Sequence, residues 1–79
     1  MVTVYRAAGF SVVIFTNDHA PAHVHVFGDG EAKINLTGPS GQPELVWAVS
    51  MTRADIRSAM VIVAEQRDHL LMRWNQIHG

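Results

Sequence analysis

The sequence contains no cysteine, and this absence excludes a disulfide framework, a thiolate zinc site and a cysteine nucleophile. Charge is also scarce. The sequence has six Lys and Arg and seven Asp and Glu, so its formal net charge is −1. No strong positive field therefore attracts nucleic acid, although nucleic acid is not excluded as a partner. The longest apolar run, Ala59 to Ala64, is too short to span a bilayer. We therefore expect a cytoplasmic protein with no membrane partner.

The chain is short, at 79 residues, and 48% of its residues are hydrophobic. These values predict one domain over residues 1–79. A domain of this length is expected to bury only ~60–65% of the surface that its unfolded chain exposes, so its net stability is small. We expect it to gain stability from a small protein partner or from self-association into an oligomer.

The two halves of the chain differ in composition. Residues 52–78 contain no glycine or proline and predict one long helix over about 52–77, with Thr52 as its N-cap and Asp55 three positions later. An unbroken helix of this length would be roughly 39 Å long, so we expect its end to project beyond the sheet, unless Arg67 marks a bend in the apolar stripe. Apolar residues recur along one helix face at Ile56, Met60, Val63, Leu70, Trp74 and Ile77.

The first half is rich in Val, Ile, Phe and Thr in short bursts, which are typical of strands separated by turns. The predicted fold class is α+β, with an antiparallel sheet of four to five strands at about 2–49 and the long C-terminal helix packed on one face. The predicted strands are 2–7, 10–16, 22–27 and 31–36, with a short fifth strand at 45–49.

The loop at Gly28-Asp29-Gly30 decides which way the strand residues point. A three-residue hairpin loop, with glycine as its last residue, pairs Val24 with Ile34 and Val26 with Ala32 and so separates apolar from polar side chains. We prefer it to a two-residue turn, which would mix the faces. The four residues then join the core, and the opposite, polar face carries His23, His25, Glu31, Lys33 and Asn35.

Five histidines are many for so short a chain, and three of them lie between residues 19 and 25. A His-x-His pair in a strand places both imidazoles on one face with Cα atoms ~6.5–7 Å apart, close enough to touch one metal ion. The candidate metal ligands are His19, His23 and His25, and Asp18 is an alternative ligand from the loop. This ligand chemistry suits Zn²⁺, Mn²⁺ or Fe²⁺.

Two other interpretations of the same cluster stay open. In the first, the protein is a metal-dependent or metal-free hydrolase that uses the His19, His23 and His25 cluster to cleave, for example, RNA. His23 and His25 exchange protons, Lys33 stabilises an anionic transition state, and other polar residues bind the substrate. In the second, the histidines are ordinary polar residues of a half-exposed sheet. The candidate binding residues are Asn17, Asp18, Glu31 and Asn35.

The segment from Asn17 to Val26, together with Gly9-Phe10, Glu31-Ala32-Lys33 and Trp74 near the end of the helix, resembles a widespread bacterial family of small domains of unknown function. Its hallmark reads roughly Asn-Asp-His-x-Pro-Pro-His-Val-His-Val. This chain has Ala22 in place of the second proline. The resemblance implies a domain encoded beside a second small protein, in an arrangement similar to a toxin–antitoxin pair, and therefore a protein partner. The matching positions are Asn17, Asp18, His19, Pro21, His23 and His25.

Overall fold

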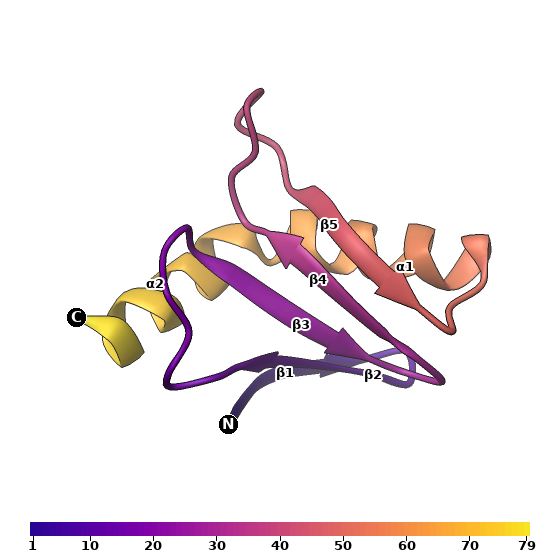
Figure 1. The fold of residues 1–79 in the computed structure, drawn as a ribbon, viewed down its shortest axis with the longest axis horizontal. Helices are drawn as coiled ribbons and strands as arrows, with labels where there is room; N and C mark the ends of the chain where they lie inside the picture. Colours follow the sequence, from indigo (N-terminus) through magenta and orange to yellow (C-terminus); the bar gives the residue numbers. More distant parts are fainter.

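The computed structural model describes residues 1–79 as a five-stranded sheet followed by two helices (Figure 1). The strands lie in the sheet in their sequence order, and each pairs antiparallel with the next. The two helices follow one another along one face of the sheet, so the α+β class is confirmed. The elements are β1 (Val2–Ala7), β2 (Phe10–Ile14), β3 (His23–Phe27), β4 (Glu31–Asn35), β5 (Glu44–Val49), α1 (Arg53–Glu65) and α2 (Arg67–His78).

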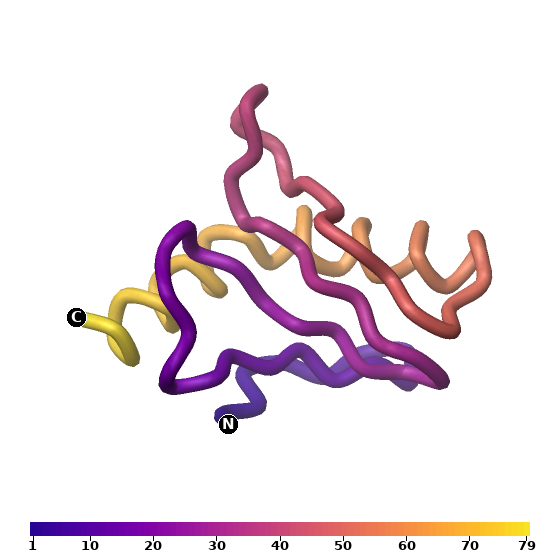
Figure 2. The backbone as a smooth tube through the Cα atoms, viewed as in Figure 1, coloured from indigo at the N-terminus to yellow at the C-terminus, as the bar shows by residue number.

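Tight turns and two longer segments connect the strands, as the chain path in Figure 2 shows. The β1–β2 turn uses Ala8 and Gly9, both with positive φ, as a two-residue hairpin requires. The β3–β4 loop has the three residues that the sequence predicts, and the predicted pairing of Val24 with Ile34 and Val26 with Ala32 is confirmed. The segment 37–43 projects beyond the sheet between β4 and β5.

The prediction of one long C-terminal helix is wrong, because the helix is interrupted at Gln66. Gln66 has φ −102° and ψ 11°, outside the helical range, so α1 ends before it and α2 begins after it. A straight helix of roughly 39 Å would exceed the 34 Å longest dimension of the fold. The interruption keeps Leu70 and Trp74 against the sheet, and the Arg67 guanidinium donates to the Gly41 carbonyl. The predicted N-cap is confirmed, since the Asp55 N–H donates to Thr52 Oγ1 at 3.1 Å.

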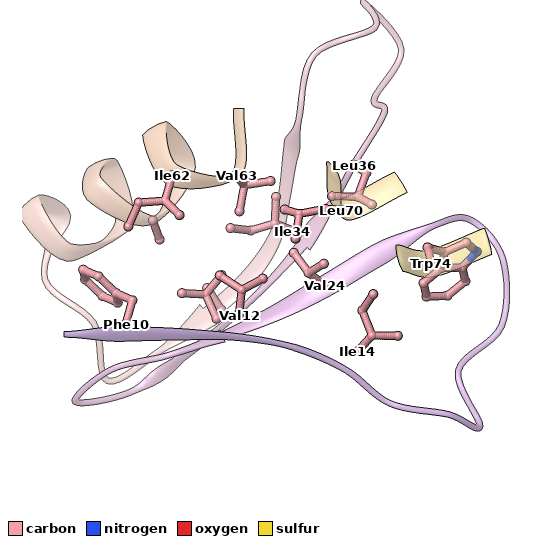
Figure 3. Packing of buried hydrophobic residues seen from close by; sticks show 13 residues of the cluster. Phe10, Val12, Ile14, Val24, Ile34, Leu36, Ile62, Val63, Leu70 and Trp74 are labelled. Atoms are coloured by element: carbon pink, nitrogen blue, oxygen red, sulfur yellow. The ribbon is translucent and has the colours of Figure 1, made fainter. Parts of the chain in front are cut away.

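The core lies between the helices and one face of the sheet (Figure 3). The predicted core residues of β3 and β4 are all buried, as are Val63, Leu70 and Trp74 from the predicted helical stripe. The remaining stripe residues are only partly buried, and two of them, Met60 and Ile77, pack against the core. Neither helix is long and apolar enough to cross a membrane.

Candidate metal centre

Two histidines of β3 lie on the face of the sheet opposite the helix-covered core. The β3–β4 register places His25 opposite Lys33 and His23 opposite Asn35, as the three-residue loop predicts. Both side chains are nevertheless buried, with only 4% of His23 and 11% of His25 exposed. The polar face that the sequence predicts therefore contains two enclosed imidazoles.

Aromatic rings enclose these imidazoles. The centroid of the His25 ring lies 4.7 Å from that of Phe15 and 6.0 Å from that of Trp47. The His23 ring lies 5.1 Å from Trp74, which reaches it from α2. The rings shield the histidines from water on several sides, which strengthens every electrostatic interaction between the polar groups that remain inside.

The segment between β2 and β3 brings a carboxylate to the two histidines. The Asp18 N–H donates to the Phe15 carbonyl at 3.1 Å, which forms a turn directly after β2. Asp18 Oδ2 lies 3.1 Å from His23 Nε2 and 3.7 Å from His25 Nε2. This oxygen is buried and has no hydrogen-bond partner, so neither imidazole is oriented to donate to it.

The other nitrogen of each imidazole is held by an acceptor. His23 Nδ1 lies 2.8 Å from the Pro21 carbonyl oxygen, and His25 Nδ1 lies 3.0 Å from Glu31 Oε2. Because a carbonyl and a carboxylate only accept, each Nδ1 carries the hydrogen and donates. In the neutral imidazole this leaves Nε2 as a lone-pair acceptor, and both Nε2 atoms lie close to Asp18 Oδ2. One ligand atom from each of these three residues lies within 4.8 Å of the other two.

This arrangement is a donor set suited to a cation. Two imidazole nitrogens and one carboxylate oxygen are ligands that Zn²⁺, Fe²⁺ and Mn²⁺ accept, and three protein ligands leave a further position for water. The Pro21 carbonyl and the Glu31 carboxylate stand where partners of metal-bound histidines usually stand, at the nitrogen remote from the metal.

The other candidate site residues lie outside this group. Asn17 and His19 are exposed in the loop, so Asp18 and not His19 is the loop residue that approaches the histidine pair. Asn35 donates to Glu44 Oε1 at 3.4 Å. Lys33 is half-buried and forms no ion pair with the cluster.

The sequence reasoning missed the rings that enclose the site. Trp74 stands in the apolar stripe of the predicted helix, which indicates a core position and gives no sign of a contact with His23, 51 positions earlier in the chain. Trp74 also stacks on His78, with ring centroids 3.8 Å apart. The sequence carries no local signal for these contacts, because they depend on where α2 crosses the end of the sheet.

Comparison with known proteins gives one match. Residues 9–75 match the model of a protein family described as a domain of unknown function, DUF4160. No curated protein and no solved structure matches the chain significantly.

Proposed function

Because the chain belongs to the DUF4160 family, a domain of unknown function, we propose its activity from the geometry of its own residues: it binds one divalent transition-metal ion through Asp18, His23 and His25.

One observation carries the proposal. Three possible ligand atoms lie within 4.8 Å of one another in a largely buried space, and the Asp18 oxygen among them has no hydrogen-bond partner. A buried polar atom without a partner costs about 1–3 kcal/mol, and acceptors that lie close together also repel. A divalent cation between them removes both costs at once.

The donor types favour Zn²⁺, with Fe²⁺ and Mn²⁺ as the other suitable ions. Nitrogen from two imidazoles together with one carboxylate oxygen matches ions of intermediate softness, and the chain has no cysteine that would favour a thiolate site. Glu31 and the Pro21 carbonyl act through the histidines, since each accepts from an Nδ1–H and so presents Nε2 to the ion.

Metal stoichiometry tests the proposal. The purified protein is stripped with a chelator and titrated with Zn²⁺ by isothermal calorimetry, and bound metal is counted after desalting. We expect one Zn²⁺ per wild-type chain, and at least ~100-fold weaker binding for Asp18→Asn and for His25→Gln, because each removes a direct ligand.

His19→Ala is the matched control, since His19 stands next to Asp18 and lies outside the group. It should bind Zn²⁺ as the wild type does. Absence of stoichiometric binding by the wild type, or loss of binding in His19→Ala with retention in Asp18→Asn, would contradict the proposed ligand set.

A protein partner is the second candidate function, and the exposed surface of β5 favours it. Four of the seven large hydrophobic residues that the fold leaves exposed lie in this edge strand: Leu45, Val46, Trp47 and Val49. Exposed apolar strands at a sheet edge are typical of surfaces that pair with another chain. A toxin–antitoxin-like pair of two neighbouring genes is the arrangement that the sequence resemblance implies.

Co-expression with the product of the neighbouring gene tests this second proposal. We expect the two proteins to co-purify through size-exclusion chromatography, and Val49→Lys to separate them, because a lysine at that edge opposes apolar contact and strand pairing. Separate elution of the wild-type proteins would overturn it.

The hydrolase hypothesis gains no support from the geometry, since the histidines are enclosed and Lys33 makes no ion pair with them.

A further inference from the structure

A shallow hollow of ≈ 440 Å³ lies beside the histidine centre, between the β3–β4 loop and the end of β5. Phe27, Trp47 and Val49 supply its apolar side chains, and Asp29 and Glu31 supply two carboxylates. Its lining residues come from the β3–β4 hairpin and from the end of β5, two segments that Figure 1 shows close to one another. Gly30 permits this close approach, because a Cβ there would overlap the Val49 carbonyl oxygen.

The lining has a definite chemistry. It combines an indole and other apolar side chains with two carboxylates, and no basic residue lines it. Glu31 uses Oε2 to accept from His25 and keeps its other oxygen free of any protein hydrogen bond. Carboxylates beside an aromatic face are the surroundings in which a guanidinium binds best, through paired hydrogen bonds and a cation–π contact.

The strand that borders the hollow is free to pair. β5 is an edge strand, so the outer side of its backbone has no partner strand. The β4–β5 ladder leaves Val46 unpaired, whereas Trp47, Ala48 and Val49 pair regularly with β4. The regular part of the edge is therefore the part that borders the hollow, and an extended segment that pairs there would carry alternate side chains on the hollow's face.

We infer that the hollow receives the guanidinium of an arginine on an extended segment of a partner protein that pairs with β5. The inference rests on the partner-binding proposal and names the chemistry of the partner. It does not depend on the metal centre. Charge complementarity carries it, because two carboxylates and three apolar side chains line a hollow that has no cation of its own. The hollow is shallow and open along a strand edge, which suits an extended chain better than an enclosed small molecule.

A second copy of this chain is the rival occupant. Its only arginine in a strand is Arg6, which lies in β1 at the opposite edge of the sheet. Pairing β1 of one copy with β5 of the next is a head-to-tail contact that repeats without closing and leads to open filaments. A different protein satisfies the same charges without that consequence.

The test uses a probe of defined chemistry. The peptide acetyl-Thr-Val-Arg-Val-Thr-amide is titrated into the ¹⁵N-labelled, full-length, chelator-treated protein, and chemical shifts are followed. We expect saturable shifts of the Gly28 and Gly30 amides and of the Trp47 indole. The same peptide with citrulline, which has the shape of arginine without its charge, should bind about tenfold more weakly.

Variants locate the charges. Asp29→Asn and Glu31→Gln should each weaken the arginine peptide several-fold, and Asp29 serves as the independent probe because it takes no part in the histidine centre. Glu44→Gln is the matched control, since Glu44 begins the same strand but lies outside the hollow. It should leave the affinity unchanged.

Three results would overturn the inference. The first is equal binding of the citrulline peptide, and the second is the absence of shifts up to about 10 mM peptide, the concentration scale of a weak contact through a single side chain. The third is concentration-dependent shifts without peptide that vanish in Arg6→Gln. The last would identify a second copy as the occupant. If the neighbouring gene product co-purifies while the peptide test fails, partner binding stands and only the arginine assignment falls.

Discussion

Asp18 is the residue on which the proposed metal centre depends. It stands in a turn directly after β2, and its Oδ2 approaches both Nε2 atoms without a hydrogen bond to either. A side chain held in this way opposes folding while no cation is bound, because its oxygen has lost water and gained no donor. Such local cost is common where a residue serves function more than stability.

The substitution Asp18→Asn separates the metal proposal from a purely structural role. An amide offers an N–H to the facing Nε2 atoms, so the metal-free variant should be more stable than the metal-free wild type by about 1 kcal/mol. Thermal unfolding in chelator should show a midpoint ~4–8 °C higher. A lower midpoint would indicate that protonated histidines donate to Asp18 in a structural ion pair, against the lone-pair arrangement.

At the scale of elements, the helical region depends on two local features, a cap and a break. Thr52 begins α1 by accepting from the Asp55 N–H. Gln66 ends α1, and α2 then packs through Leu70 and Trp74, its only buried residues. α2 is thus attached by few side chains, one of which also contacts His23.

Removal of the cap should weaken α1 by a small, measurable amount. Thr52→Ala loses the side-chain acceptor for one free helix N–H and should lower the free energy of unfolding by about 1 kcal/mol. Urea denaturation measures this change. Ser58→Ala, at an exposed position inside α1, is the control and should be neutral or slightly stabilising. Equal effects of both substitutions would argue against the cap.

The attachment of α2 is testable in the same way. Leu70 is fully buried, so Leu70→Ala should cost about 2–5 kcal/mol through lost apolar contact and the cavity left behind. Met72, two positions later and 48% exposed, is the control, and Met72→Ala should change the midpoint of denaturation little. A near-neutral Leu70→Ala would show that α2 is not docked on the sheet.

At the scale of the whole molecule, the sheet separates two different environments. One face is covered by both helices and contains the apolar core. The other face contains the histidines under aromatic rings and the β2–β3 segment, with the hollow beside β5. The proposed metal ligands come from both a strand and that segment, so an ion would hold the segment to the sheet.

Metal binding should therefore stabilise the entire fold. At a free Zn²⁺ concentration of 100 times the dissociation constant, mass action adds about 2.7 kcal/mol, which raises the unfolding midpoint of a domain of this length by more than ~10 °C. Scanning calorimetry with Zn²⁺ and then with excess chelator measures the shift and its reversal. Asp18→Asn, which is expected to bind at least ~100-fold more weakly, should shift by at most a few degrees, and a rise equal to that of the wild type would indicate binding elsewhere.

Much of the sheet follows from local sequence. The alternation of Val24 and Val26 with His23 and His25, together with the three-residue loop at Gly28-Asp29-Gly30, predicts the register of β3 and β4 that the structure has. Turn residues, strand runs and the Thr52 cap are likewise local signals, because each depends on backbone preferences and hydrogen bonds within a few residues.

The sequence by itself therefore determined the strand order of the central hairpin, the side of the sheet on which the histidines lie and the start of the helical region. Only the tertiary structure decided that the helix breaks at Gln66 and that His23 and His25 are buried. It also decided that Asp18 approaches them while His19 is exposed and lies outside the group. The physical reason is the separation in sequence of the residues that make these contacts. Burial and convergence depend on contacts between segments far apart in the chain, such as Trp74 on His23, and no local pattern encodes them.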